Sequence, residues 1–252
     1  MRDFTLHAYK VLCLEFKKRG YEFVTFADYC ANKIDRRFVL LRHDVDTKPL
    51  NALKVAQLEN QIGVRSSFYF RIVKHSYDEN IINVISKLEH EIGYHYEDFA
   101  SARGNGEKAI RMFERNLGRL NKLCRVKTIC MHGSPLCKFD NLRLWQEYEY
   151  RDFGIAGEVY LDTDFSEVFY LTDTGRCWNG REVTVRDRVS SRYERFYKST
   201  FDIIKSLRNH ALPHKVMINA HPQRWNDEVI PWFRELIWQN CKNVVKKYVL
   251  VR

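Results

Sequence analysis

The sequence predicts an α/β fold in which parallel strands alternate with helices, and we expect a single TIM-like barrel domain over residues 1–252. Short apolar runs rich in strand-forming residues alternate with segments of helical periodicity along the whole chain. No stretch rich in proline, glycine or serine divides the chain. Polar residues follow several predicted strands, which is where barrels assemble their active sites, so we favour a barrel over a doubly wound sheet.

The first predicted element is an amphipathic helix over residues 4–19. Its apolar positions recur at helical spacing and a glycine follows them: Phe4, Ala8, Val11, Leu12 and Gly20. We interpret residues 1–37 as a helical segment packed on the barrel. The first strand is the apolar run at residues 38–43, and Pro49 opens the next helix, which ends near Gly63.

The alternation of strand and helix then continues to the end of the chain. Predicted strands cover residues 66–72, 92–95, 126–131, 156–161, 169–172 and 216–220. Predicted helices cover residues 81–90, 110–120, 141–150, 196–207 and 229–240. No Gly-x-Gly-x-x-Gly or Walker glycine loop follows any of these strands, so a dinucleotide- or ATP-binding fold lacks its main support.

The chain is basic, with 42 Lys and Arg against 32 Asp and Glu, a formal net charge of +10. Such a surface attracts anions, including nucleic acid, acidic lipid and phosphorylated sugars. The basic residues are dispersed, the densest stretch being residues 181–198, and no RNP, zinc-finger or helix-turn-helix pattern accompanies them. We therefore expect no nucleic-acid partner. A nucleic-acid-binding protein stays as a third hypothesis, which predicts binding that weakens steeply with salt.

Cellular location and redox state follow from two further features. No apolar run approaches the ~18–20 residues that a membrane span needs. The N-terminus has no apolar core or cleavage site typical of a signal peptide, so we expect a cytoplasmic protein. The seven cysteines are irregularly spaced without a Cys-x-x-Cys pair, which indicates reduced thiols rather than disulfides or a thiolate zinc site.

Candidate catalytic residues follow four of the predicted strands. Asp44 and Asp46 come after the first strand, where one carboxylate can bind a metal while the other acts as a base; alone, the pair also fits a helix cap. His95, His132 and His221 follow three other strands. Histidine and carboxylate are the ligands that zinc and related divalent metals accept, and a catalytic site uses about three of them. The coincidence of four strand ends favours one shared site.

Four segments, in this order, resemble the motifs of the polysaccharide deacetylase superfamily, also called NodB-homology or carbohydrate esterase 4. They are Leu40–Asp46, Glu91–His95, Met131–Pro135 and His221–Trp225. The resemblance covers residues 39–225, depends on the order and spacing of the motifs, and is strongest to the branch with His-Asp-Val-Asp in the first motif. It implies a distorted (β/α)7 barrel that removes acetyl groups from sugars with a divalent metal, usually zinc.

The resemblance also implies a role for each matching residue. Asp44 matches the general base, Asp46 the metal-binding aspartate and His95 the first metal-binding histidine. His221 matches the general acid that protonates the leaving amine. The inserted Val45 leaves the division of roles between Asp44 and Asp46 open.

The sequence departs from the family pattern at two positions. Phe99 stands four residues after His95, where a second metal-binding histidine is expected, and the third motif lacks its usual arginine. Asp98, His132 and His43 are candidates for the third ligand, and we favour His132.

Further residues after the predicted strands suit a carbohydrate. We assign Asp98, Asp173, Arg176, Trp178 and Trp225 to substrate binding, with carboxylates accepting hydroxyl hydrogen bonds and indoles stacking on sugar rings. Tryptophans in such positions fit the protein core as well.

The main hypothesis is a metal-dependent hydrolase that removes an acetyl group from an N-acetylated sugar or sugar conjugate, in surface-polysaccharide synthesis. A cytoplasmic location and a basic surface favour a nucleotide- or lipid-linked substrate. The alternative is a catalytically inactive barrel that binds carbohydrate and has lost its metal, which predicts binding unaffected by a chelator.

Overall fold

The computed structural model describes residues 2–133, 137–179, 189–193 and 195–247. Its strands form one parallel sheet in the order β6-β5-β4-β3-β2-β8-β7, with β1 paired to β2 beside this path. The strands are β1 (Glu22–Val24), β2 (Phe38–Val45), β3 (Ser67–Phe70), β4 (Glu91–Tyr96), β5 (Thr128–Met131), β6 (Gly157–Glu158), β7 (Phe169–Thr172) and β8 (Lys215–Ala220). Every pairing is parallel, so successive strands require crossovers on the outside of the sheet.

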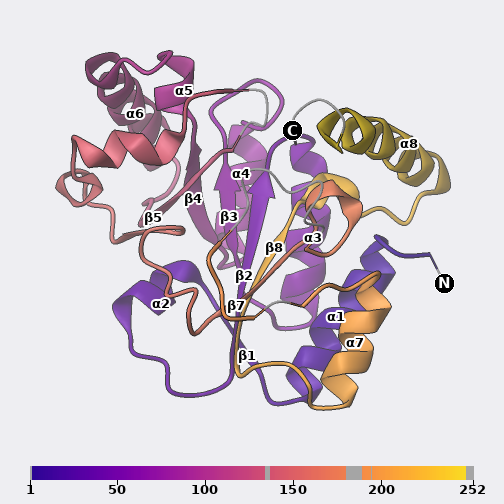
Figure 1. Ribbon diagram of the computed structural model, residues 1–252. Coiled ribbons are helices and arrows are strands. Elements are labelled where there is room, and N and C mark those ends of the chain that lie inside the picture. Colours follow the sequence, from indigo (N-terminus) through magenta and orange to yellow (C-terminus); the bar gives the residue numbers. More distant parts are fainter. Residues whose placement is uncertain (1, 134–136, 180–188, 194, 248–252) are drawn as a thin grey trace.

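Helices cover the outer face of this curled sheet (Figure 1). The α-helices are α1 (Leu6–Lys18), α2 (Phe26–Ala31), α3 (Pro49–Gln61), α4 (Glu79–Lys87), α5 (Asp98–Ser101), α6 (Gly106–Asn121), α7 (Thr200–Arg208) and α8 (Val229–Val245). The short 3-10 helices are η1 (Asn141–Gln146), η2 (Tyr150–Phe153), η3 (Thr174–Arg176) and η4 (Pro222–Arg224). Helices α1 and α7 lie side by side in both ribbon views, although they come from opposite ends of the chain.

Strand β2 lies at the centre of the sheet and is buried on both faces. Its side chains alternate between two apolar clusters, because successive residues of a strand point to opposite faces. Phe38 and Leu40 join the smaller cluster inside the barrel, whereas Val39 and Leu41 join the larger one under the helices. Asp44, at an even position like Leu40, therefore lies on the inner face.

The predicted α/β fold class of parallel strands and crossover helices is confirmed. Among the described residues no strand pairing joins β6 to β7, so the barrel is distorted and incompletely closed. Within the same residues, no helix combines the length and the apolar character that crossing a membrane requires.

Several element boundaries differ from the sequence predictions. The segment 1–37 contributes strand β1 as well as helices α1 and α2, and β1 extends the sheet along β2. The strand predicted at 156–161 shrinks to β6, and the helix predicted at 141–150 consists of η1 and η2. Helix α7 begins at Thr200 rather than at residue 196, because the Ser199 side chain accepts a hydrogen bond from the backbone N–H of Asp202 and caps the helix.

Candidate functional site

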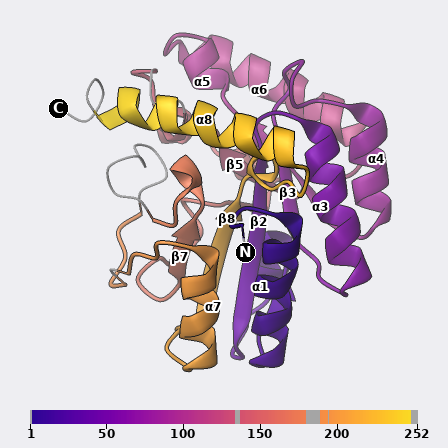
Figure 2. The same ribbon diagram turned by 90° about the vertical axis from the view of Figure 1, so that its right-hand side faces the viewer.

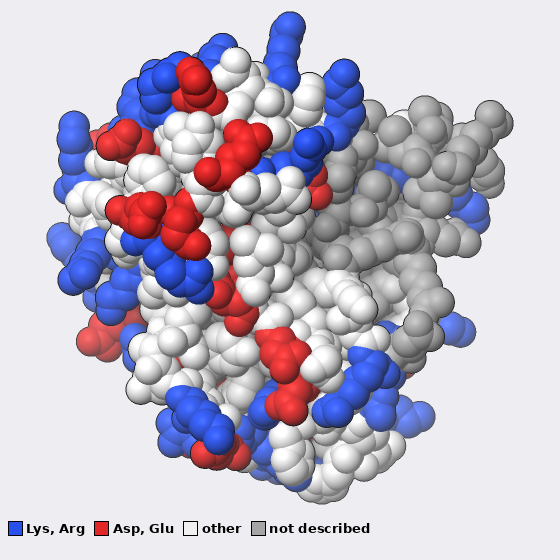
Figure 3. Space-filling view, turned by 60° about the vertical axis from the view of Figure 1, so that its left-hand side comes forward, with Lys and Arg blue, Asp and Glu red and all other residues white. Residues whose placement is uncertain are grey.

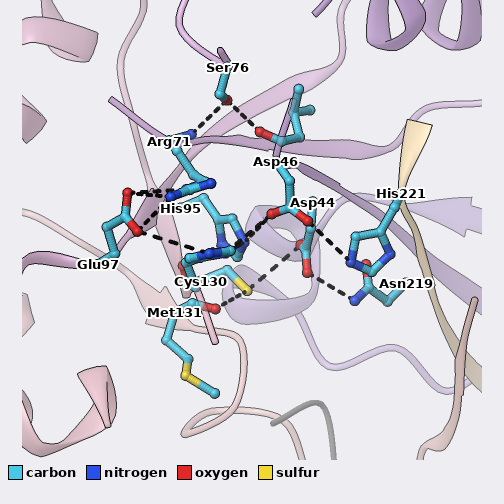
Figure 4. Close-up of polar contacts among 12 residues, drawn as sticks. Asp44, Asp46, Arg71, Ser76, His95, Glu97, Cys130, Met131, Asn219 and His221 are labelled. Carbon is cyan, nitrogen blue, oxygen red and sulfur yellow. Dashed lines mark hydrogen bonds and ion pairs between the residues drawn. The ribbon is translucent and has the colours of Figure 1, made fainter. Parts of the chain in front are cut away.

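The candidate site lies at the carboxyl ends of the parallel strands. Asp44 is the penultimate residue of β2, and Asp46 is the first residue after this strand. His95 lies on β4, His132 follows β5 and His221 follows β8. In Figure 4 the side chains of Asp44, Asp46, His95 and His221 point toward one another from these separate strands. The structure thus brings together all five residues to which the sequence assigned catalysis or metal binding.

Three of these residues form a group with the geometry of a metal site. The ligand-type atoms of Asp46, His95 and His132 all lie within 4.8 Å of one another. Asp46 Oδ1 is 3.2 Å from His132 Nδ1 and 3.6 Å from His95 Nε2, and the two ring nitrogens are 3.2 Å apart. The same Oδ1 is buried without a hydrogen bond in the described part of the chain. Two imidazoles and one carboxylate are the ligands that zinc accepts in catalytic sites, so these residues fit a divalent cation.

The electrostatics of Asp46 suit a metal ligand. Burial alone would raise the pKa of its carboxyl, but the imidazoles of His132 and His95 outweigh burial and hold this pKa well below its usual range. Asp46 is therefore an ionised carboxylate at neutral pH, as a metal ligand must be.

Neighbouring groups fix the orientation of both metal-site imidazoles. His95 Nδ1 lies 2.9 Å from the carbonyl oxygen of Cys130, which can only accept, so Nδ1 carries the proton and Nε2 presents its lone pair to the site. The ring of His132 has Nδ1 toward Asp46, while its Nε2 lies 4.0 Å from Glu97 Oε2. The guanidinium of Arg71 donates hydrogen bonds from Nη2 to Glu97 Oε1 at 2.8 Å and to Oε2 at 2.7 Å.

Arg71 is itself positioned by the ends of two strands. Its backbone N–H donates to Ser76 Oγ at 3.1 Å, and the Ser76 hydroxyl donates to the carbonyl oxygen of Val45 (Figure 4). The Arg71–Glu97 pair is therefore tied to the segment that carries Asp46.

His221 is held by a buried carboxylate on its far side. Its Nδ1 lies 2.6 Å from Asp173 Oδ1, and its Nε2 faces Asp46 Oδ2 at 3.9 Å. Asp173 also accepts from Trp225 Nε1 at 2.8 Å and from the guanidinium of Arg224. Burial opposes ionisation of Asp173, but Arg224 and His221 together lower its pKa to about 2. Nδ1 of His221 faces both Asp173 Oδ1, which only accepts, and the Arg224 guanidinium at 2.7 Å, which only donates, so Nε2 is the ring nitrogen left to face the site.

Asp44 lies deeper in the barrel than Asp46. Its Oδ2 accepts from Asn219 Nδ2 at 2.9 Å and lies 3.4 Å from the buried guanidinium of Arg42. Its Oδ1 is 3.9 Å from Cys130 Sγ, and Asp44, His95 and Cys130 form a second group of ligand-type atoms within 4.8 Å. Asp44 thus lies on the inner face with the buried guanidinium of Arg42 beside its carboxyl group.

Sequence reasoning missed several of these supporting residues. Arg42 and Asn219 pair in register across β2 and β8, each two residues before a predicted site residue. The two-residue period of a strand would have placed both on the inner face with Asp44 and His221. Cys130 lies two residues before His132 and could have been found in the same way.

Two alternative metal ligands are excluded. His43 points to the outer face of β2, where its Nε2 lies 2.8 Å from Glu59 Oε1 beneath the helices. Asp98 is buried and accepts hydrogen bonds from Tyr94 at 2.7 Å and from Asn116 at 2.8 Å, and burial raises its pKa to about 6. The prediction that Asp98 contacts substrate is therefore wrong, because its oxygens are engaged within the fold.

Packing also argues against the substrate-binding predictions for Asp173, Trp178 and Trp225. Trp178 and Trp225 are only 0% and 1% exposed, so neither indole offers a face to a sugar ring. Asp173 is buried, and its oxygens contact His221, Arg224 and Trp225. Arg176 packs over the ring of Trp232 at 4.4 Å and donates to its carbonyl oxygen. Asp173 and Trp225 therefore position His221, and Trp178 lies in the core. Arg176 Nη2 is buried without a hydrogen bond in the described residues, so the assignment of Arg176 to substrate stays a prediction.

Two sequence features lie wholly or partly outside the described residues. They are Ser134 and Pro135 of the third motif, and positions 181–188 and 194 of the densest basic stretch. On the face shown in Figure 3, Lys and Arg alternate with Asp and Glu and form no continuous basic patch. The dispersed charge expected from the sequence is visible on this face.

Comparisons with known proteins give a similarity of fold at low sequence identity. No protein-family model matches the chain, and no curated protein matches it. A CE4 family pseudoenzyme from Bacillus anthracis is 11% identical with a TM-score of 0.42, covering 85% of this chain and 63% of its own length. The chain thus spans less than two thirds of that protein.

Two further solved structures are similar to the same extent. The Xyl-CE4 domain of a multidomain xylanase from the hindgut metagenome of Trinervitermes trinervoides is 13% identical with a TM-score of 0.41, covering 83% of this chain and 85% of that one. The peptidoglycan deacetylase PdaC from Bacillus subtilis is 11% identical with a TM-score of 0.40, covering 85% of this chain and 98% of that one.

Proposed function

We propose that the protein is a metal-dependent hydrolase that removes an acetyl group from an N-acetylated sugar or sugar conjugate. The observation that carries this proposal is the convergence of Asp46 Oδ1, His95 Nε2 and His132 Nδ1, with the buried Oδ1 lacking a hydrogen bond. The motif order in the sequence supports the acetylated sugar as substrate. We propose zinc as the ion, because two imidazoles and one carboxylate suit it.

The residues around this group divide the work of amide hydrolysis. A divalent cation held by Asp46, His95 and His132 would polarise the acetyl carbonyl and lower the pKa of a water. Asp44 accepts the proton of the attacking water, with Arg42 stabilising the carboxylate before the transfer. His221 Nε2 donates a proton to the leaving nitrogen, so that the C–N bond breaks to give acetate and an amine. Asp173 stabilises the imidazolium that His221 must carry for this donation.

The cellular setting completes the proposal. We place the protein in the cytoplasm, acting on a nucleotide- or lipid-linked acetylated sugar during surface-polysaccharide synthesis. Both carriers bring phosphate groups, which the net charge of +10 attracts.

Metal content and acetate release test the proposal together. The protein is purified without chelator, its metals are measured by elemental analysis, and acetate release is followed with UDP-N-acetylglucosamine and with N-acetylglucosamine oligomers. We expect near-stoichiometric zinc or another first-row metal, and activity that chelator removes and zinc restores. The variants Asp46→Ala and His95→Ala should lose both, while His75→Ala, which removes an exposed histidine, should keep both. Absence of metal even after soaking in zinc would refute the proposal and favour the inactive carbohydrate-binding barrel.

A further inference from the structure

Helix α8 presents its apolar side to solvent and its polar side to the protein. Glu235 and Gln239 are buried, whereas the large apolar side chains along the opposite side are 50–66% exposed. These outward residues, which we call the α8 stripe, are Val229, Ile230, Phe233, Ile237, Trp238, Val244 and Val245. A helix on the surface of a globular protein normally has the reverse arrangement. Exposed apolar side chains gathered along one side of a helix in this way indicate an interaction site.

Specific polar contacts fix this orientation of the helix. Glu235 pairs with Lys48 at 3.1 Å, and Asn243 Nδ2 donates to the carbonyl oxygen of Gly175 at 2.7 Å. Trp232 Nε1 donates to the carbonyl oxygen of Asp3 at 2.7 Å. Turning the apolar side inward would break all three contacts, so the outward stripe is built into the fold.

The charges on α8 indicate what covers the stripe. Arg234 and Lys242 are exposed, and Lys247 is exposed just beyond the helix. Glu235 is the only acidic residue within α8 and is turned inward, and the N-cap residue Glu228 pairs with Lys54 at 2.9 Å. Lys242 also lies 5.4 Å from the centre of the Trp238 ring, which combines an aromatic ring and a cation at the border of the stripe. A second copy of this surface would set like charges against each other, whereas anionic lipid headgroups would complement them.

We propose that α8 docks the protein on a bilayer surface that carries anionic headgroups. With Phe233 and Trp238 at the acyl boundary and the cations at headgroup level, α8 has the pattern of a helix that lies in the membrane interface. The helix of 17 residues is about 25 Å long, enough for several such side chains to insert along one line.

This surface borders the candidate site. Helix α8 contacts η3 and η4, which directly follow Asp173 and His221. Figure 2 shows α8 lying crosswise over the ends of β2 and β8. Docking would therefore bring the mouth of the site beside the bilayer. Combined with the proposed function, and resting on it, this arrangement favours a lipid-linked acetylated sugar over a nucleotide-linked one.

Vesicle sedimentation with the full chain tests the docking. Vesicles of phosphatidylcholine alone are compared with vesicles that also contain phosphatidylglycerol. We expect binding to the anionic vesicles only, weakened by salt and unaffected by chelator. Because Phe233→Ser removes the burial of one aromatic side chain in the bilayer, it should weaken partitioning roughly tenfold or more. Phe196→Ser is the matched control, since Phe196 is 58% exposed against 50% for Phe233 and lies outside α8.

A fluorescence measurement gives an independent readout of the same contact. Trp238 is the most exposed tryptophan described, so its emission should shift to the blue with anionic vesicles, and Trp238→Phe should abolish the shift. Absence of binding by the wild type, or equal binding by Phe233→Ser and Phe196→Ser, would overturn the proposal. A dimer in sedimentation velocity that Phe233→Ser dissociates would also overturn it, because a second copy would then cover the stripe. None of these three results changes the metal content of the protein, so the two proposals fail separately.

Discussion

Replacing His132 with alanine tests the most specific feature of the candidate metal centre. His132 contributes Nδ1, which lies 3.2 Å from both Asp46 Oδ1 and His95 Nε2. A four-ligand structural zinc site binds with about 10–16 kcal/mol, which averages about 3 kcal/mol for each ligand. Since 1.4 kcal/mol corresponds to a tenfold change, losing one ligand should weaken zinc binding by about 100-fold.

Zinc affinity is measured by competition with a chromophoric chelator at fixed pH. The wild type, His132→Ala and the exposed-histidine control His75→Ala are compared, and thermal unfolding of the metal-free proteins checks that each variant is folded. We expect the wild type and His75→Ala to agree and His132→Ala to be about 100-fold weaker. The imidazole of His132 is partly exposed, so its removal should cost the metal-free fold little.

Equal zinc affinity in all three proteins would refute the ligand role of His132. The second group of ligand-type atoms, Asp44, His95 and Cys130, would then be the candidate that holds the ion. In that case Cys130→Ala, and not His132→Ala, should lower the affinity, so one pair of variants distinguishes the two arrangements.

Three further predictions concern the residues that support the site and the fold. The pKa of Asp173 is lowered to about 2, so the ionised carboxylate stabilises the folded protein above pH ~4, and this stabilisation is lost as pH falls toward ~2. At 1.36 kcal/mol per pKa unit, the contribution to the free energy of unfolding is about 2.5 kcal/mol. Urea unfolding between these pH values should show this loss in the wild type, and Asp173→Asn should lack it; an unchanged pH profile in the variant would contradict the assignment. Glu59→Ala should lower the free energy of unfolding by about 3–5 kcal/mol in urea titrations, because it removes the buried carboxylate that pairs with His43 and accepts from Tyr9 and Ser66; a loss below about 1 kcal/mol would contradict this. Glu97→Gln should weaken zinc binding by about 10–100-fold with little change in stability, because it removes the negative charge 4.0 Å from His132 Nε2. Unchanged zinc affinity would show that this charge does not affect the site.

The positions of the main catalytic candidates could be predicted because they depend on topology alone. In a parallel sheet every carboxyl end meets the same rim, so residues that follow different strands converge without knowledge of the strand order. Asp46, His95 and His132 converge for this reason. Glu97 lies two residues after His95, so the same argument places it at this rim, but its contact with Arg71 depends on β3 and β4 being neighbours, which the sequence does not say.

The tryptophans show where sequence reasoning fails. Trp225 follows His221 by four residues, and nothing in the sequence says whether its indole turns toward the mouth of the barrel or back into the core. The structure turns it inward against Phe4 from the N-terminal segment, at 5.0 Å between ring centres, with its N–H on Asp173. Both partners are more than 50 residues away along the chain, so only the folded structure reveals that Trp225 contacts the carboxylate beside His221.

Helix α8 illustrates a related ambiguity in amphipathic patterns. Periodicity identifies the residues that share one side of a helix, but it does not say which way that side faces. Burial usually decides the direction, because apolar surface is more stable away from water. In α8 the inward side instead carries Glu235 and Asn243, whose partners Lys48 and Gly175 lie on other elements. This outward apolar side and the cations beside it are the observations on which the proposed docking at anionic headgroups rests.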